Sequence, residues 1–140
     1  MIAVDSGFLF ALLDRRDAWH RLAAALAGTA AEGWITTWPV LSEACLLIHR
    51  SLDSTIAVAL MEDVADGGIS IWNPPREQFA RLPGLMRKYA KLPMDLADAS
   101  LILLAEHLGH GQIISTDQRD FGTFRWKSRK PFHNLLQAAP

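Results

Sequence analysis

The stretch IAVDSGFLFALLD (residues 2–14) places three apolar residues directly before the polar group Asp5, Ser6 and Gly7. A short apolar run that ends in polar residues is typical of a strand that is buried on both faces. The apolar segment Phe8–Leu13 then favours the start of a helix. The beginning of the chain therefore predicts a buried strand followed at once by a helix, with an acidic residue at the junction.

The rest of the chain repeats this alternation of short strands and longer helical segments. Further strands are expected at Trp34–Trp38, Ile69–Trp72 and Gln112–Thr116, with a last short strand within Pro131–Leu136. Helices are expected at Asp17–Leu26, Val40–His49, Thr55–Val64, Gln78–Tyr89 and Met94–Leu108, with Pro83 disturbing the fourth of these. The alternation predicts an α/β domain with a mostly parallel central sheet that is covered by helices on both faces.

Composition limits the possible classes of protein. The chain has 140 residues, half of them hydrophobic, with 14 Lys or Arg against 15 Asp or Glu. These values predict one globular domain over residues 1–140 without a uniformly basic surface. Cys45 is the only cysteine, which excludes an internal disulfide and a cysteine-based zinc site. Because neither a signal peptide nor a long apolar run is present, we expect a cytoplasmic protein without membrane contact.

Four acidic residues stand where they are expected to meet at one edge of the sheet. Asp5 ends the first predicted strand and Asp117 ends a late one, while Glu43 and Asp98 lie near the starts of two predicted helices. In open α/β sheets, ligands bind beyond the carboxyl ends of the strands. Each acid also has a structural interpretation, because Asp favours helix N-caps and turns. Their common placement favours a shared site.

Carboxylates packed together repel one another, and burial raises the cost of each charge. A hard divalent cation relieves this repulsion, and Mg²⁺ or Mn²⁺ prefers such oxygen ligands. An ion held in this way activates water and holds a phosphate oxygen, which are the two tasks of phosphodiester hydrolysis. No histidine stands out as a general base, and the five histidines are expected to be surface or packing residues.

Four segments in the same order resemble PIN-domain ribonucleases, and specifically VapC-type toxins of VapBC toxin–antitoxin systems. These segments are IAVDSGFLFALLD (2–14), TTWPVLSEACLLI (36–48), DLADASLILLAEHLG (95–109) and IISTDQRDF (113–121). The resemblance implies a three-layer domain with four or five short strands. It also implies a metal-dependent endoribonuclease that cleaves RNA with Mg²⁺ or Mn²⁺ and inhibits translation and growth.

The resemblance assigns roles to individual residues. The implied catalytic acids are Asp5, Glu43, Asp98 and Asp117. Of these, Asp5 and Asp98 are expected to be the most direct metal ligands, with Glu43, Asp117 and Asp95 in a second tier, and Asp95 remains an alternative to Asp98. Ser6 and Thr116 match small polar residues that support the site. Asp120 is expected to be a turn residue, with Phe121 packed beneath it.

Basic residues gather beside the third and fourth acids and suggest where RNA binds. The candidates are Arg87, Lys88, Lys91, Arg119, Arg125 and Lys127. Phe124 and Trp126 lie among them and offer surfaces on which an unpaired base stacks, although an inward-packed Trp126 is favoured. The resemblance further implies a cognate VapB-type antitoxin and a homodimer. The alternatives are a non-catalytic PIN-like nucleic-acid-binding module, or a PIN-type nuclease that acts on DNA or in RNA processing.

Overall fold

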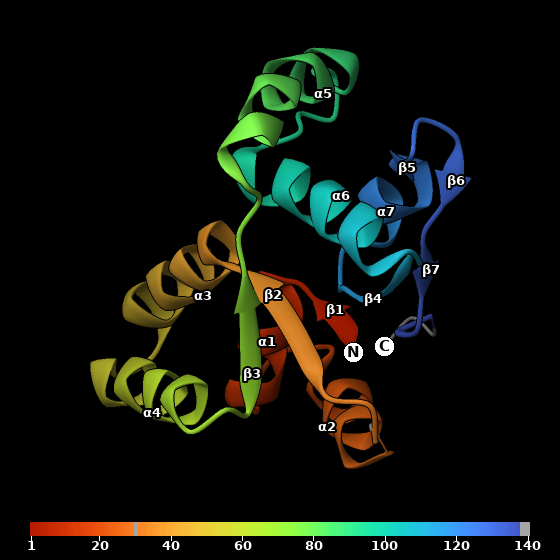
Figure 1. Cartoon of the computed structure of the whole chain (residues 1–140). Helices are drawn as coiled ribbons and strands as arrows, with labels where there is room; N and C mark the ends of the chain where they lie inside the picture. The colour runs from red at the N-terminus through yellow and green to blue at the C-terminus, as the bar shows by residue number, and fades with distance from the viewer. Residues whose placement is uncertain (30, 138–140) are drawn as a thin grey trace.

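A parallel five-stranded sheet forms the centre of the molecule in the computed structural model, which describes residues 1–29 and 31–137 (Figure 1). The strand order is β3-β2-β1-β4-β7, and all four pairings are parallel. These strands are β1 (Ile2–Val4), β2 (Trp34–Thr37), β3 (Ile69–Trp72), β4 (Gln112–Ile114) and β7 (His133–Asn134). The predicted α/β class with a mostly parallel sheet is confirmed.

Helices cover both faces of this sheet. They are α1 (Ser6–Leu13), α2 (His20–Thr29), α3 (Trp38–Ser51), α4 (Ser54–Ala65), α5 (Leu82–Lys88), α6 (Leu96–Leu108) and α7 (Gln118–Thr123), with a 3-10 helix η1 (Arg76–Arg81) before α5. A two-stranded antiparallel hairpin, β5 (Arg125–Trp126) with β6 (Lys130–Pro131), lies beside α6. None of the helices in the described ranges is long and apolar enough to span a membrane.

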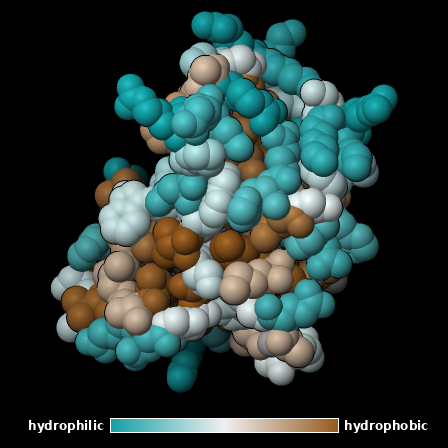
Figure 2. All heavy atoms as spheres, in the orientation of Figure 1, coloured by the Kyte–Doolittle hydropathy of each residue, from teal (hydrophilic) through white to brown (hydrophobic). Residues whose placement is uncertain are grey.

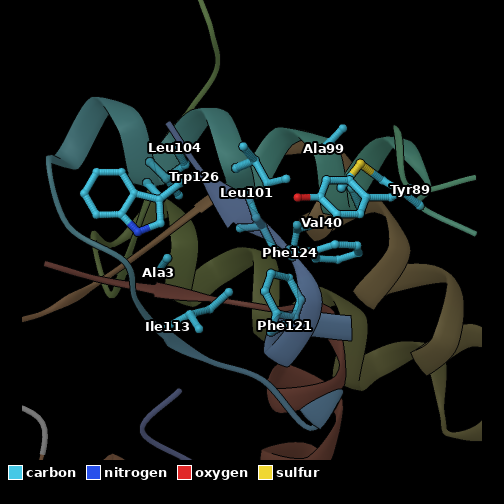
Figure 3. Close-up of a cluster of buried hydrophobic side chains, with 14 of the residues drawn as sticks. Ala3, Val40, Tyr89, Ala99, Leu101, Leu104, Ile113, Phe121, Phe124 and Trp126 are labelled. Carbon is cyan, nitrogen blue, oxygen red and sulfur yellow. The ribbon is translucent and has the colours of Figure 1, made fainter. Parts of the chain in front are cut away.

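Alternate residues of the central strands feed two separate hydrophobic clusters. Ala3 and Ile113 belong to the cluster under α6, where Phe121, Phe124 and Trp126 also pack (Figure 3). Ile2, Val4 and Ile114 belong instead to the cluster formed with α1, α3 and α4. Because successive side chains of a strand point to opposite faces, this division defines the three layers of the domain.

Several predicted boundaries were wrong for local reasons. Trp38 begins α3 instead of ending β2, because Pro39 occupies the first turn of that helix. The expected helix Gln78–Tyr89 is divided into η1 and α5 at Leu82, directly before Pro83. Strand β4 ends at Ile114, so Asp117 is not a strand end but the N-cap of α7, a helix that was not expected. The expected last strand is present as the two-residue β7.

We predict that Phe121→Ala lowers the free energy of unfolding by about 3–5 kcal/mol, because it leaves a cavity in a packed core. The Phe121 side chain is 2% exposed and makes edge-to-face contacts with Phe124 and Phe132. Phe79→Ala is the matched control, because Phe79 is 52% exposed and its loss is expected to cost less than about 1 kcal/mol. Urea unfolding of both variants measures the difference. Equal losses would contradict this assignment of the core.

Candidate functional site

An acidic pocket lies at the carboxyl edge of the sheet, where β1 and β4 end beside the start of α6. Its volume is about 310 Å³. Six carboxylates line it, together with small and apolar residues: Asp5, Glu43, Asp95, Asp98, Asp117 and Asp120, with Ser6, Gly7, Leu47, Leu92, Pro93 and Thr116. The four acids singled out in the sequence therefore share one pocket, although they come from separate segments of the chain.

Asp5 is one of two buried acids in the pocket and is 7% exposed. Its Oδ1 accepts the N–H of Ser6 at 2.7 Å, which caps α1, and its Oδ2 accepts the hydroxyl of Ser115 at 2.9 Å. Burial raises the pKa of Asp5 to about 6, and the nearby charges of Glu43 and Asp117 add to this rise. The two hydrogen bonds oppose the rise because they favour the ionised form.

Glu43 reaches the pocket from α3, and its carboxylate accepts a hydrogen bond from α1. Ser6 Oγ donates a hydrogen bond to Glu43 Oε1 at 2.9 Å. Partial burial raises the pKa of Glu43, and the negative charge of Asp95 contributes to the increase. Ser6 thus contacts both acids, since its backbone N–H binds Asp5 and its hydroxyl binds Glu43.

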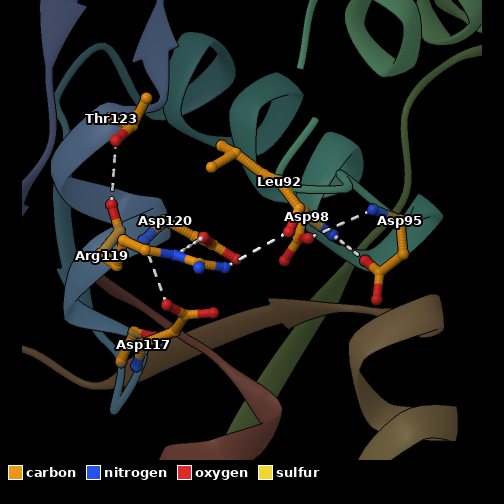
Figure 4. A network of polar contacts seen from close by, with 8 residues as sticks. Leu92, Asp95, Asp98, Asp117, Arg119, Asp120 and Thr123 are labelled. Atoms are coloured by element: carbon orange, nitrogen blue, oxygen red, sulfur yellow. Dashed lines mark hydrogen bonds and ion pairs between the residues drawn. The ribbon is translucent and has the colours of Figure 1, made fainter. Parts of the chain in front are cut away.

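Asp95 and Asp98 form a capping box at the start of α6 (Figure 4). The N–H of Asp98 donates to Asp95 Oδ1 at 2.8 Å, and the N–H of Asp95 donates to Asp98 Oδ2 at 3.2 Å. Asp98 is partly buried, whereas Asp95 is exposed. Burial and the adjacent carboxylate of Asp95 hold the pKa of Asp98 well above its usual range. Both side chains line the pocket, and the greater burial of Asp98 favours it as the inner acid.

Asp117 caps the start of α7 by accepting the N–H of Asp120 at 3.1 Å. Its own N–H donates to Ser115 Oγ at 3.0 Å. Burial raises the pKa of Asp117, and the charge of Asp120 raises it further. The prediction that Asp120 is a turn residue was wrong, because this residue is buried within α7 and lines the pocket. Phe121 packs in the core beneath it, as expected.

Ser115 is a site residue that the sequence interpretation missed. Its hydroxyl joins Asp5 to the backbone of Asp117, whereas Thr116, the residue expected to give this support, contacts Gly7. A Cβ atom on Gly7 would clash with Thr116 Oγ1, so this close approach requires glycine. Local sequence patterns do not identify Ser115, because its contacts depend on the pairing of β4 with β1 and β7.

The donor set of the pocket fits a hard divalent cation. Carboxylate oxygens are the ligands that Mg²⁺ and Mn²⁺ prefer, and Mg²⁺ often keeps several waters while it binds one or two carboxylates. Within residues 1–29 and 31–137, no three acidic, histidine or cysteine side chains converge closely enough to form a ready-made metal cluster. The raised pKa values of Asp5 and Asp98 show that their charges are costly without a compensating positive charge.

The basic residues near the pocket differ in how far their side chains are already engaged in contacts within the protein. Arg119 is exposed at the pocket edge, where its Nε binds Asp120 at 3.1 Å and its Nη2 donates to the carbonyl of Leu92 at 3.3 Å (Figure 4). Arg125 instead donates to three carbonyls at the end of α7. Phe124 and Trp126 are buried, so the suggested stacking of a base on either ring was wrong and the inward packing of Trp126 is confirmed.

Comparison with known proteins gives a family and a fold. The family model described as "PIN domain" matches residues 2–126. The structure is similar to the crystal structure of VapC20 from Mycobacterium tuberculosis, described as a sarcin-ricin loop cleaving toxin, with a TM-score of 0.77 and 19% sequence identity. That match covers 85% of this chain and 92% of VapC20. No curated protein matches the sequence.

We predict that the metal-free protein loses stability as the pH rises from about 4 to 7. The pKa of Asp5 is higher in the folded chain than in an unfolded chain, so folding favours its protonated form and ionisation opposes folding. The contribution of Asp5 amounts to roughly 3 kcal/mol at most, and Asp98 acts in the same direction.

Asp5→Asn is expected to flatten this pH dependence, as measured by urea unfolding in the presence of EDTA. The amide retains an acceptor for the N–H of Ser6. Asp66→Asn is the control, because Asp66 is exposed at the end of α4, and its profile is expected to follow the wild type. A variant Asp5→Asn with an unchanged slope would contradict the prediction.

Proposed function

The chain belongs to the PIN domain family, and we propose that it is a metal-dependent endoribonuclease that serves as the toxin of a type II toxin–antitoxin pair. The observation that carries the proposal is the convergence in one pocket of carboxylates from the end of β1, from α3 and from the starts of α6 and α7. Helix capping explains Asp5, Asp95 and Asp117 one by one. It does not explain why six carboxylates share one pocket, where their mutual repulsion destabilises the fold.

Asp5 and Asp98 are the proposed direct ligands of Mg²⁺ or Mn²⁺, with Glu43, Asp117 and Asp95 in support. When bound, such an ion lowers the pKa of a water molecule and stabilises negative charge on phosphate and leaving oxygens. The protein holds the carboxylates in place for this task. Ser115 orients Asp5, and Ser6 links Asp5 to Glu43. The roles of these residues are proposals that rest on their geometry and on the family.

RNA is the proposed substrate, and basic side chains near the pocket would bind its phosphates. Arg119 lies at the pocket edge and Lys88 at the end of α5, where its Nζ donates to the carbonyl of Ser128 at 3.3 Å. The other proposed contacts are Arg87, Lys91, Arg125 and Lys127. Arg125 is the weakest of these candidates, because its guanidinium already binds the end of α7.

Protein partners are proposed to cover apolar side chains on α3 and α4. Trp38 and Leu46 on α3, with Val58 and Met61 on α4, are large hydrophobic residues that remain exposed. Figure 2 shows hydrophobic residues gathered over this part of the molecule, whereas the region of α5 is mostly hydrophilic. Such a patch supports association with a VapB-type antitoxin, with a second copy of the chain, or with both. Within this proposal the protein acts in the cytoplasm.

We predict that Asp5→Asn and Asp98→Asn each reduce RNA cleavage at least about 100-fold, because each removes a charged ligand of the ion. Cleavage of a single-stranded RNA with Mg²⁺ or Mn²⁺ measures the effect, and circular dichroism checks the fold. Asp66→Asn is the matched control and is expected to cleave at the wild-type rate. Wild-type cleavage that persists in excess EDTA, or variants with full activity, would refute the metal mechanism.

The role as a toxin is tested separately by expression in a bacterial host. Wild-type protein is expected to arrest growth, whereas Asp5→Asn at the same level is not. The arrest is expected to be relieved by co-expression of the proposed VapB-type antitoxin. Normal growth with active wild-type protein, confirmed by cleavage in the lysate, would indicate a nuclease with another role.

A further inference from the structure

Asn134, near the end of the described chain, binds the backbone of two other residues through its side-chain amide. The N–H of Ser115 donates to Asn134 Oδ1 at 3.1 Å, and Asn134 Nδ2 donates to the carbonyl of Ser115 at 2.9 Å. The same Oδ1 accepts the N–H of Leu136 at 3.1 Å. The amide of Asn134 thus binds the backbone of Ser115 at both of its polar groups, one residue beyond the end of β4.

Ser115 in turn contacts two of the acids in the pocket. Its fully buried hydroxyl donates to Asp5 at 2.9 Å and accepts the N–H of Asp117 at 3.0 Å. A second amide reinforces the arrangement, because Gln118 Nε2 donates to the carbonyls of both Ser115 and Leu136. The chain of contacts therefore runs from β7 through Ser115 to the ends of β1 and β4.

We infer that Asn134 is a positioning residue of the acidic pocket, which acts through Ser115 on Asp5 and Asp117. Asn134 lies outside residues 2–126, the segment that the PIN family model matches. Figure 1 shows β7 beside β4 at the edge of the sheet. The effect of Asn134 on ion binding and cleavage rests on the proposed function, whereas its effect on the order of the segment 115–117 does not.

Amide hydrogen exchange of the metal-free protein tests the positioning directly. Asn134→Ala is expected to speed amide exchange at Ser115, which Asn134 contacts directly. The variant is also expected to speed amide exchange about three- to tenfold at Asp117, which Asn134 does not contact. If Asn134 only held Leu136 in place, the variant would speed amide exchange at Leu136 and Ser115 and leave the exchange rate of Asp117 unchanged. That result would overturn the inference. Asn134→Asp is the second variant, because it retains an acceptor for both N–H groups but replaces the donor with a charged oxygen that faces the carbonyl of Ser115.

Asn73→Ala is the matched control for these measurements. The side chain of Asn73 also accepts a backbone N–H, that of Trp38 at 3.2 Å, but it lines a different pocket beside Pro74 and Phe79. The control is therefore expected to leave the exchange of Ser115 and Asp117 unchanged. A similar acceleration at Asp117 in Asn73→Ala would show a general loosening of the fold and would overturn the specific role of Asn134.

A double-mutant cycle with Ser115→Ala tests whether Asn134 acts through Ser115. Each single variant is expected to weaken Mn²⁺ binding by about 10–100-fold and to lower kcat more than it raises KM. If Asn134 acts through Ser115, adding Asn134→Ala to the Ser115→Ala variant lowers Mn²⁺ affinity and kcat by less than about a further threefold. A double variant whose losses in Mn²⁺ affinity and kcat equal the product of the two single losses would overturn the inference. A wild-type protein that neither binds Mn²⁺ nor cleaves RNA would refute the proposed function, while the exchange results still decide the positioning role.

Discussion

The hydrogen bond from Ser115 to Asp5 is the contact on which the acidic pocket depends. Asp5 follows the central strand β1 and is almost fully buried, so its charge is tolerated only if both oxygens have donors. The Ser6 N–H satisfies one oxygen and the Ser115 hydroxyl the other. Because Ser115 follows the neighbouring strand β4, this bond also joins the ends of two parallel strands. The position of Asp117 follows, since its N–H binds the same hydroxyl.

Three carboxylates of the pocket also serve as helix N-caps. Asp5 caps α1, Asp95 caps α6 and Asp117 caps α7. The first turn of a helix has unpaired N–H groups and a partial positive charge, which offset part of the repulsion between the acids. Capping and ion binding are therefore not competing interpretations of these residues. The same contacts that start three helices also place their acids in one pocket at the sheet edge.

The sequence patterns were sufficient to predict the layers of the fold, but they predicted fewer of the elements and contacts around the pocket. β1 and β3 have the predicted bounds because short apolar runs between polar residues leave few alternatives. Helix α7 was not predicted because its sequence QRDFGT has little apolar periodicity. Its start is determined by the capping side chain of Asp117. The role of Asp120 was missed for the same reason. Ser115 and Asn134 depend on strand pairing between distant segments, which local patterns do not contain.

The strand that carries Asn134 is the shortest of the sheet and lies at one of its two edges. β7 has two residues and pairs on one side only, with β4. Edge segments of this size open at a lower free energy than the centre of a domain. Thermal fluctuations that release this strand would therefore disturb the pocket while the remaining four strands stay paired. Heat is therefore expected to disorder the pocket below the temperature at which the helices melt.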